Sequence, residues 1–506
     1  MDYDDVIVGG GSAGIALATR LSEDPARRVL LIEAGPDDPE VTDRDRLGDQ
    51  MRFSASLTDW ATDATFVAGT TLNYPQGRRM GGGSAVNGAF AVRGVRDDYE
   101  RWAAAAGDDW SWPHMLRVLC RLETDRDVTA DYHGHDGPVP VVRWRRDELL
   151  PVQESFREAV SAHGIPWVDD MNAPDASGIG AMPMNRQDGL RMSTALTYLA
   201  QVRGRRNLTL WPGTQVARIV LENGRAVGVE YTSDGRRQQV RGARVILSAG
   251  ALQSPTLLLR SGIGPAGHLA DVGIDCAVDL PGVGGNLVDH VGVVVFLVPR
   301  GGLGAPDDRV CQLAARFSSS EGTADDMWLS MWSAWELDEF PDLRRALGVD
   351  AVSAVIVGVH DPLSRGTVRL RSDDADDTPL VDFRMLTEPA DLSRLVEGLQ
   401  LAMEVASSPA YADSYKGIGL LDPASARDRE ALEGYIRAST GGWYHAAGTC
   451  RMGTDPDGGD VVDGRLRVHG VESLHVVDAS VMPTVTRAPT NLSSIAIGER
   501  AAELLR

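Results

Sequence analysis

The segment YDDVIVGGGSAGIALATRL, residues 3–21, joins a short apolar run to a glycine-rich turn and then to apolar residues spaced four apart, which is typical of a helix. Gly9, Gly11 and Gly14 have the separation found in dinucleotide-binding turns. There the first glycine forms the turn, the second lets the backbone approach a pyrophosphate, and the third lets the helix pack against the strand. The segment therefore predicts a strand, a tight turn and a helix whose N-terminus binds a pyrophosphate.

A second apolar run, RVLLIEAG at residues 28–35, contains an acidic side chain, Glu33. In dinucleotide-binding folds an acid about twenty residues beyond the last glycine meets the ribose hydroxyls. A glycine motif alone is weak evidence, but two strands, a helix and this acid together favour a dinucleotide site over an ordinary strand–helix turn. The pattern does not distinguish FAD from NAD, so an NAD enzyme stays open at this point.

The composition narrows the class of protein. The chain has 506 residues, which suggests more than one domain, and a net charge of −22, which argues against a nucleic-acid partner. The four cysteines lack metal-binding spacing, and the N-terminus lacks the positive charge of a signal peptide. The most apolar run, residues 291–298, is too short to cross a bilayer. We therefore expect a soluble, cytoplasmic protein with no nucleic-acid or membrane partner.

Two further glycine-containing blocks lie in the middle of the chain. GRRMGGGSAVNGAF, residues 77–90, has three consecutive glycines among apolar residues, which indicates backbone pressed against a ligand rather than a flexible loop. ARVILSAGALQSPTLLLRSGIG, residues 243–264, predicts a strand, a turn of small residues and a helix that opens at Ser254 and Pro255, because proline suits the first helical position. Before it, residues 211–231 predict a hairpin that turns at Asn223 and Gly224.

These blocks resemble the glucose–methanol–choline (GMC) family of FAD oxidoreductases. Residues 77–100 are similar to the first family signature, with Met80 where the family more often has Leu, Ile or Val, and GALQSPTLLLRSGIG at residues 250–264 matches the second. The similarity extends to VVDASVMPTVTRAPTNLSSIAIGERAA at residues 476–502 and is closest to bacterial hydroxymethylfurfural- and choline-type alcohol oxidases.

The resemblance implies an α/β fold with an α+β substrate part. A discontinuous Rossmann-like FAD-binding domain of the p-hydroxybenzoate hydroxylase type is expected over residues 1–138, 188–295 and 441–506. A substrate-binding domain with an antiparallel sheet is expected over residues 139–187 and 296–440.

The resemblance also implies which residues meet FAD. Val216 is expected to hold the adenine through its backbone, while Asp478 and Ala479 reach the pyrophosphate and ribityl region. Some members attach FAD through a histidine in the first glycine block, but Val86 stands at that position here, so we expect non-covalent FAD. The complete expected set is Gly9, Gly11, Ser12, Ala13, Gly14, Glu33, Ala34, Gly81, Gly82, Ser84, Asn87, Val216, Ala249, Gly250, Asp478, Ala479 and Asn491.

The segment TGGWYHAAGTCRMG, residues 440–453, carries the expected catalytic histidine. By resemblance, His445 faces the flavin and Asn491 is the residue that pairs with it. Oxidation of an alcohol removes a proton from oxygen and a hydride from carbon, and histidine has a pKa suited to taking that proton. Asparagine cannot take a proton, so of this pair only His445 can be the base. Asn491 can donate its amide N–H to the substrate oxygen as negative charge builds there.

The substrate is expected to be a small alcohol, with O₂ or another electron acceptor as the second partner. Trp443 and Tyr444 should narrow the pocket and favour a flat or slim primary alcohol. The segment DDMWLSMWSAWELDEF, residues 325–340, has apolar residues at helical spacing, which favours core packing in a helix. The alternative is a wall of the substrate pocket in which Glu336 or Glu339 meets a cation.

Several alternatives remain at this point. HGHDGPV, residues 133–139, offers possible metal ligands, but the family commonly has a surface loop there, so no metal is expected. The same fold also serves as a hydroxynitrile-type lyase or a photodecarboxylase in this family. A dehydrogenase with an acceptor other than O₂ and a non-catalytic flavin-binding scaffold stay open as well.

Overall fold

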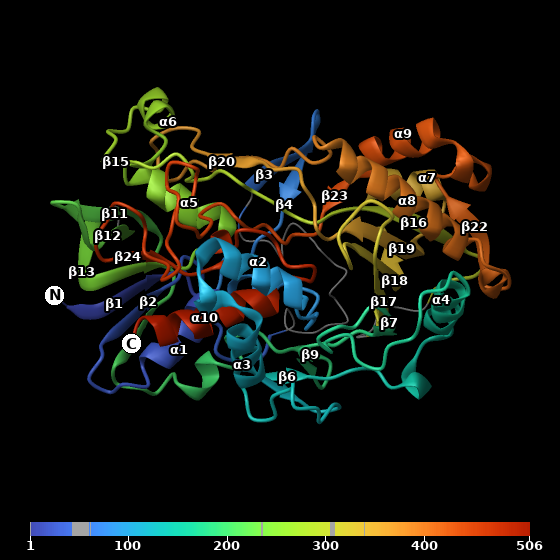
Figure 1. Ribbon diagram of the computed structural model, residues 1–506, viewed down its shortest axis with the longest axis horizontal. Coiled ribbons are helices and arrows are strands. Elements are labelled where there is room, and N and C mark those ends of the chain that lie inside the picture. Colours follow the sequence, from blue (N-terminus) through green and yellow to red (C-terminus); the bar gives the residue numbers. More distant parts are fainter. Residues whose placement is uncertain (1, 43–59, 61, 234–235, 304–308, 339) are drawn as a thin grey trace.

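The computed structural model describes residues 2–42, 60, 62–233, 236–303, 309–338 and 340–506. In Figure 1 the described elements form two parts. One contains both chain ends and a largely parallel sheet, and the other contains a large antiparallel sheet covered by helices.

The first sheet contains the predicted dinucleotide-binding segment. Its parallel strands are β10 (Leu208–Trp211), β2 (Val29–Ile32), β1 (Tyr3–Val8), β13 (Arg236–Leu247) and β24 (Leu474–Val476), paired in that order. The sheet continues into the antiparallel strands β12 (Arg225–Ser233) and β11 (Val216–Glu222). These two strands form the predicted hairpin, and both residues of its turn, Asn223 and Gly224, have positive φ, as hairpin turns require.

Helices cover this sheet. α1 (Ser12–Leu21) follows the glycine turn as predicted and contacts α10 (Asn491–Leu504), the last helix of the chain. The two helices pack closely: a Cβ atom on Gly498 would lie 2.4 Å from the carbonyl oxygen of Ala13. The other helices of this part are α2 (Arg96–Ala106), α3 (Trp112–Leu122), α5 (Gly250–Arg260) and α6 (Ala266–Asp271).

One expectation for this part is wrong. Helix α5 begins at Gly250 rather than at Ser254, so Pro255 lies inside the helix. Proline has no backbone N–H, which leaves the carbonyl of Ala251 without its helical donor. The hydroxyl of Thr449 donates to that carbonyl at 2.6 Å. A side chain from a distant segment therefore compensates for the proline.

The second sheet is antiparallel, as the resemblance implies. Its strands are β22 (Tyr415–Gly419), β16 (Val291–Pro299), β19 (Ala351–Val359), β18 (Met327–Glu336), β17 (Leu313–Phe317) and β7 (Gly178–Ala181), in that order, with β23 (Gly441–Gly442) also paired to β16. The helices of this part are α4 (Pro151–Ala162), α7 (Pro341–Leu347), α8 (Pro389–Ala406) and α9 (Arg429–Ser439). Because β16 spans the predicted boundary at residue 295, the division of the chain into domains remains a prediction.

The predicted helix in residues 325–340 is also wrong, because residues 327–336 form strand β18. Met327, Leu329 and Met331 face the core between the sheet and its helices, whereas Trp328 and Trp332 line a cavity on the other face. Since both faces of the strand contact other groups, apolar residues occupy both. The alternation of period two that marks a half-exposed strand is therefore missing from the sequence.

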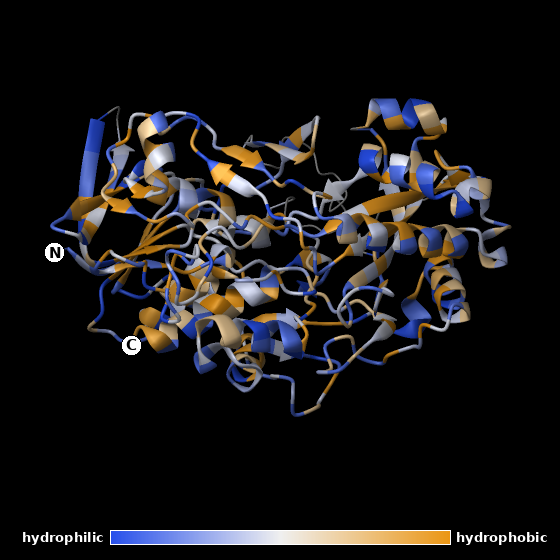
Figure 2. Cartoon of the chain, turned by 45° about the horizontal axis from the view of Figure 1, so that its top comes forward, coloured by the Kyte–Doolittle hydropathy of each residue, from blue (hydrophilic) through white to orange (hydrophobic). Residues whose placement is uncertain are grey.

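Two main hydrophobic cores follow the two sheets. Figure 2 shows apolar residues gathered on the strands, while the outer helices carry hydrophilic faces. The short strands are β3 (Thr62–Val67), β4 (Thr70–Tyr74), β20 (Thr367–Arg369) and β21 (Leu380–Asp382) in one sheet, and the pairs β5 (Glu123–Asp125) with β6 (Val139–Val141), β8 (Arg186–Gln187) with β9 (Leu190–Arg191), and β14 (Ile263–Gly264) with β15 (Val278–Asp279). None of the helices in the described part of the chain combines the length and apolarity that a membrane crossing requires.

Candidate active site

A cavity of about 1140 Å³ is lined on one side by the turn between β1 and α1 and on the other by strands β16, β18 and β19. Pockets for drug-sized ligands usually measure about 300–1,000 Å³. This cavity therefore has room for a large cofactor beside a small substrate.

The glycine turn brings backbone to the cavity surface. Gly9 has a φ of +109°, and a Cβ atom there would lie 2.3 Å from the carbonyl oxygen of Ser248. A Cβ atom on Gly14 would lie 2.0 Å from the carbonyl oxygen of Gly9. The first and third glycines therefore have the roles that the motif predicts: one permits the turn, and the other permits close packing of α1.

Glu33 lies at the end of β2 beside this turn. Its two carboxylate oxygens accept the backbone N–H groups of Gly10 at 2.8 Å and Gly35 at 2.9 Å. Burial raises the pKa of Glu33 above its ordinary value, and these N–H donors oppose that shift. Glu33 thus couples the glycine turn to β2 and lines the cavity where a ribose is expected.

The second glycine block packs directly on the first. It forms a short 3₁₀ helix, η4 (Gly82–Ala85), and a Cβ atom on Gly82 would lie 2.8 Å from the Cα of Gly11. Ser84 turns away from the cavity, since its hydroxyl donates to the carbonyl of Gly81 at 2.6 Å. The sequence predicted that this block presses against a ligand. In the structure it packs against the backbone of the first glycine block, and its contact with a ligand remains a prediction.

The structure gathers most of the residues expected at FAD around one cavity. The residues that line it are Gly9, Gly11, Ser12, Ala13, Glu33, Ala34, Gly82, Asn87, Val216, Ala249, Gly250, Asp478, Ala479 and Asn491, together with His445, Trp443 and Tyr444. Gly14, Gly81 and Ser84 are not among the lining residues and instead shape the turns behind them.

Asn491 begins α10 next to the glycine turn. Its Oδ1 accepts the hydroxyl of Ser12 at 3.0 Å. Its Nδ2 is buried and has no hydrogen-bond partner within the described part of the chain. Because a buried amide N–H without a partner is costly, this group is suited to donate to a bound cofactor or substrate.

Asp478 organises another part of the cavity wall, at the start of α5. Its carboxylate accepts the backbone N–H of Gly250 at 2.8 Å, the hydroxyl of Ser254 at 2.6 Å and the backbone N–H of Ser480 at 2.8 Å. Burial raises the pKa of Asp478, against these donors. Asp478 therefore joins the start of α5 to the segment after β24.

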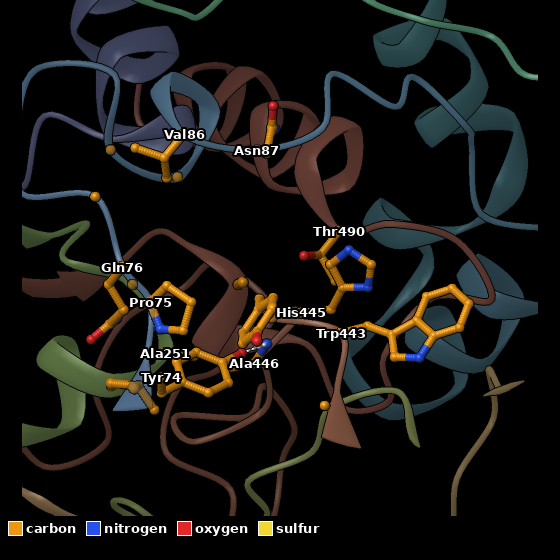
Figure 3. A pocket seen from close by; sticks show the side chains of 18 of the residues that line it. Tyr74, Pro75, Gln76, Val86, Asn87, Ala251, Trp443, His445, Ala446 and Thr490 are labelled. Carbon is orange, nitrogen blue, oxygen red and sulfur yellow. Dashed lines mark hydrogen bonds between the residues drawn. The ribbon is translucent and has the colours of Figure 1, made fainter. Parts of the chain in front are cut away.

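The loop that carries His445 is held by Asp289, a buried residue just before β16. Asp289 accepts the backbone N–H groups of Trp443 at 3.3 Å, Tyr444 at 3.0 Å and His445 at 3.0 Å. It also accepts the hydroxyl of Tyr74 at 3.0 Å, and that hydroxyl oxygen accepts the backbone N–H of Ala446 at 3.0 Å. Figure 3 shows this loop across the cavity from Val86 and Asn87.

The ring of His445 contacts a second histidine. Its Nδ1 lies 2.8 Å from Nδ1 of His290, whose Nε2 lies 2.9 Å from the carbonyl oxygen of Thr486. Burial, with His290 as a neighbour, lowers the pKa of His445 well below its ordinary value. His445 is therefore neutral near pH 7, which is the state a base requires.

Sequence reasoning did not identify Tyr74, Asp289, His290 or His360, the histidine whose ring stacks on His290 at 4.0 Å. A signal was available in NLVDHVGV, residues 286–293, where an acid and a histidine directly precede a strongly apolar run. Polar residues at the edge of a buried strand are good candidates for a site.

Trp443 and Tyr444 both line the cavity but are held differently. The indole of Trp443 lies over two glycines that pair across β16 and β19, because a Cβ atom on Gly292 or Gly358 would lie 2.3 Å or 2.8 Å from it. Tyr444 is 45 % exposed, and its ring meets Tyr74 edge-on at 5.3 Å. Trp443 is therefore fixed in the sheet, whereas Tyr444 lies towards solvent.

The loop at residues 133–139 contributes to a buried ionic cluster. The side chains of Glu123, Asp125 and His133 lie close enough to hold a metal ion. However, Arg93 pairs with Glu123 at 2.6 Å and Arg143 pairs with Asp125 at 2.8 Å. The arginines already compensate the carboxylates, so the absence of a metal stays our prediction for this cluster.

The comparisons with known proteins agree with this geometry. Two models of GMC oxidoreductases match the chain, one over residues 3–292 and the other over residues 362–498. A 5-(hydroxymethyl)furfural oxidase from Methylovorus sp. (strain MP688) is 36 % identical, with 99 % of this chain and 98 % of the relative covered. An alcohol dehydrogenase [acceptor] from Pseudomonas putida is 33 % identical, with 99 % and 95 % covered.

Solved structures of similar proteins have the same fold. Pyridoxine 4-oxidase from Mesorbium loti superimposes with a TM-score of 0.92 at 32 % identity, covering 99 % of this chain and 98 % of the other. A fungal aryl-alcohol oxidase superimposes with a TM-score of 0.82 at 26 % identity, covering 100 % and 98 %.

Proposed function

The chain belongs to the GMC oxidoreductase family, and on this premise we propose that it oxidises a neutral, flat primary alcohol to the aldehyde, with FAD as hydride acceptor and His445 as base. The observation that carries the proposal is the position of His445: its ring lines the cavity that the glycine turn enters.

The cavity residues fit FAD. GMC oxidoreductases bind this cofactor, and here the glycine turn and the N-terminus of α1 would hold the pyrophosphate, while Glu33 would meet the ribose. The buried, unpartnered Nδ2 of Asn491 is a donor that a bound group would satisfy. When bound, FAD supplies the acceptor for the hydride that leaves the alcohol carbon.

His445 would accept the alcohol proton. The O–H bond breaks as an N–H bond forms on the ring, and a base placed in this way contributes about 10²–10⁴-fold in rate. The hydrogen bonds from residues 443–445 to Asp289 fix the backbone of the base before the substrate arrives. His445 would therefore already be in position when the alcohol binds, and no free energy would be spent on placing it during the reaction.

Asn491 has two candidate roles, as donor to the cofactor or as donor to the substrate oxygen. Its contact with Ser12, at the start of α1, ties it to the glycine turn. This contact favours the cofactor role, since a pyrophosphate is expected beside the same turn. The oxyanion role expected for Asn491 from the sequence remains the alternative.

The substrate part of the cavity favours a neutral aromatic or furanic alcohol. Its wall carries the side chains of Phe90, Val294, Phe296, Trp328, Ser330, Trp332, Trp335, Phe340, Leu343 and Ile356. None of these described residues is charged, and Glu336 does not line the cavity; Glu339 lies outside the described residues. The related furfural oxidase and aryl-alcohol oxidase carry names that fit such a substrate. Aromatic faces also attract quaternary ammonium groups, so choline belongs in the test panel.

We further propose that FAD is bound without a covalent link, because Val86, which lines the cavity, has no nucleophilic atom. Acid precipitation should then release all of the flavin into the supernatant. A cytoplasmic location is likewise our proposal, consistent with the free cysteines of the chain.

The deciding experiment is an absorbance spectrum of the purified protein, followed by anaerobic titration with 5-(hydroxymethyl)furfural, benzyl alcohol, pyridoxine and choline. A flavin spectrum that an aromatic or furanic alcohol bleaches supports the proposal. A colourless protein that cannot be reconstituted with FAD refutes it, and a flavin that no alcohol bleaches favours the lyase, photodecarboxylase or scaffold alternatives. Peroxide release under air separates an oxidase from a dehydrogenase that uses another acceptor.

A further inference from the structure

His290 occupies an unassigned position behind the base. It is fully buried immediately before β16, and its two ring nitrogens have different partners. Nδ1 faces Nδ1 of His445 at 2.8 Å, and Nε2 faces the carbonyl oxygen of Thr486 at 2.9 Å. Two successive hydrogen bonds therefore link the Thr486 carbonyl to His290 and His290 to His445, which lines the cavity.

The direction of each hydrogen bond follows from its acceptors. A carbonyl oxygen can only accept, so Nε2 of His290 carries a proton and donates it to Thr486. Burial lowers the pKa of His290 to about 4, so the ring is neutral near pH 7 and carries no second proton. Its Nδ1 is then an acceptor, and the proton between the two Nδ1 atoms belongs to His445.

We propose that His290 is a positioning residue that holds His445 in the tautomer with its proton on Nδ1, so that the lone pair of Nε2 is free for the alcohol. The proposal rests on the proposed function for its kinetic consequence, but the tautomer itself is a property of this chain. When Nε2 takes the alcohol proton, the O–H bond breaks and an Nε2–H bond forms. The Nδ1–H of His445 continues to donate to His290, which stabilises the charged ring.

The surroundings prevent the His290 ring from turning over. It stacks on His360 with ring centres 4.0 Å apart and an angle of 6° between the planes, and His360 stacks in turn on Trp328 at 5.0 Å. Trp443 also meets His360, with ring centres 4.7 Å apart and the two rings nearly perpendicular. A ring flip would exchange Nδ1 with Cδ2 and Nε2 with Cε1, so a C–H would face His445 and the Thr486 carbonyl would lose its side-chain donor.

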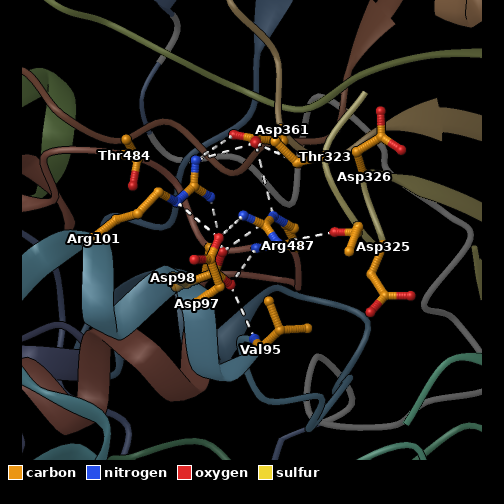
Figure 4. Close-up of polar contacts among 12 residues, drawn as sticks. Val95, Asp97, Asp98, Arg101, Thr323, Asp325, Asp326, Asp361, Thr484 and Arg487 are labelled. Atoms are coloured by element: carbon orange, nitrogen blue, oxygen red, sulfur yellow. Dashed lines mark hydrogen bonds and ion pairs between the residues drawn. The ribbon is translucent and has the colours of Figure 1, made fainter. Parts of the chain in front are cut away.

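The peptide group that contains the Thr486 carbonyl is anchored through the next residue, Arg487, which lies in a polar network (Figure 4). The backbone N–H of Arg487 donates to Asp98 at 2.9 Å, and the same carboxylate oxygen accepts the N–H of Val95. The Arg487 guanidinium, 1 % exposed, pairs with Asp97 at 2.5 Å and contacts Asp98 at 3.3 Å. This network connects α2 to residues 486–487, whose Thr486 carbonyl accepts the hydrogen bond from His290.

In the part of the chain that the structure describes, the titratable groups near His290 are two histidines and two aspartates. His445 and His360 face its ring, Asp289 precedes it in the chain, and Asp361 acts on it at longer range. Asp289 directs its carboxylate to the backbone of residues 443–445 and to Tyr74. Among the described residues, the polar groups that act directly on the His290 ring are thus the Thr486 carbonyl, the Nδ1 of His445 and the backbone of His360.

The test uses FAD-loaded protein with ¹⁵N-labelled histidines, in which His445→Gln assigns the His445 signals. We expect Nδ1 of His445 to carry the proton and Nε2 to be bare at pH 7. His290→Phe removes the acceptor, and His445 should then exchange between tautomers. His290→Asn retains an acceptor near the Nδ1 position and should restore the wild-type pattern.

The kinetic readout runs in parallel. His290→Phe should lower the rate constant of flavin reduction about 10–100-fold, by analogy with the loss of a partner that orients a metal-binding histidine, with little change in alcohol affinity. His290→Asn should recover most of that loss, and the surface variant His163→Asn should behave as wild type.

A proton on Nε2 of His445 in the wild type would overturn the proposal, as would an unchanged tautomer in His290→Phe together with a rate constant within threefold of wild type. If His290→Phe does not fold, the wild-type spectrum and His290→Asn still decide the question. If no alcohol reduces the flavin in any variant, the proposed function fails, while the tautomer measurement still tests the role of His290.

Discussion

The carboxylate of Asp289 accepts the backbone N–H of His445 at 3.0 Å. The residue that follows it, His290, contacts the ring of the same histidine at 2.8 Å. Two consecutive residues thus hold both the backbone and the side chain of His445, the proposed base. Because a base must be placed to within a fraction of an ångström of its substrate, we expect this pair to be as sensitive to substitution as the cavity wall.

Replacing His445 by glutamine should leave FAD bound and lower the rate constant of flavin reduction by the best alcohol about 10²–10⁴-fold, since the proton acceptor is lost. Stopped-flow measurement of flavin bleaching checks this, with His163→Gln on the surface as a matched control. A rate constant within a fewfold of wild type, with flavin content unchanged, would show that another group is the base.

Replacing Asp289 by asparagine should destabilise the protein by about 1–3 kcal/mol, because an amide N–H would face backbone donors.

The effect of this substitution should also depend on pH. Burial raises the pKa of Asp289 from 3.8 to about 7. The folded state then keeps a proton that the unfolded state has lost, so this contribution to the free energy of unfolding is fully present below pH 4 and is lost as the pH rises towards 7. The wild-type advantage over Asp289→Asn should shrink between pH 4 and pH 8 in urea titrations. The exposed residue Asp422 supplies a control, Asp422→Asn, that should not change with pH in this way, and a constant difference for Asp289→Asn would contradict the assignment.

Replacing Asn491 by alanine should weaken FAD binding about tenfold or more, as expected when about 1.4 kcal/mol of binding free energy is removed, and should change the reduction rate of the remaining flavin only slightly. Fluorescence titration of the apoprotein with FAD measures the first effect. Ser12→Ala, which removes the partner of Asn491, should shift the dissociation constant in the same direction. A normal FAD affinity with a large loss of reduction rate would instead assign the amide to the substrate oxygen.

Replacing Gly358 by alanine should displace Trp443, since the new Cβ would lie 2.8 Å from the indole and 3.0 Å from the carbonyl oxygen of Val291. Overpacking of this kind typically costs about 1–3 kcal/mol, and a shifted indole should alter KM and kcat together. Gly434 in helix α9 has open space around it, so Gly434→Ala is the matched control and should be neutral or slightly stabilising. If the free energy of unfolding of Gly358→Ala were unchanged, the indole of Trp443 would have more space above Gly358 than the 2.8 Å distance indicates.

The ionic cluster around His133 should respond to pH and not to metals. Burial lowers the pKa of His133, but its hydrogen bonds to Asp170 and Glu123 outweigh burial, and the pKa lies above 6.5. Its contribution to stability is therefore fully present below pH 6.5 and is lost as the pH rises through the higher folded value. His133→Gln should remove this dependence in thermal melts. Addition of EDTA or Zn²⁺ should leave the melting temperature unchanged, and a rise with Zn²⁺ would indicate a metal site.

The cofactor side of the protein was largely predictable from the sequence. The glycine turn, the hairpin at Asn223 and Gly224 and the antiparallel second sheet are confirmed. Glycine positions are readable because they report local backbone constraints, namely a positive φ or a close approach that a Cβ atom would block. The family resemblance added which segments of the chain were expected to come together around the cofactor.

The two incorrect elements have a common cause. In β18, apolar side chains occupy both faces of a strand that is buried on both sides, so its spacing resembles a helix. In α5, the proline is tolerated because Thr449 bonds the carbonyl that the ring leaves free. In both cases a tertiary contact overrides a local preference.

The glycine turn could be recognised from the local spacing of its residues, and the histidine that lines the cavity could be recognised from its resemblance to a family segment. How that histidine is held depends on the packing of segments that lie far apart in the chain. His290 and His445 are 155 residues apart in the chain. They meet because β23 pairs with β16, with Gly442 opposite Val291 and Gly441 opposite Gly292. A two-residue strand of glycines carries no side-chain pattern that specifies its partner, so the contact that positions His445 arises from the packing of the whole sheet.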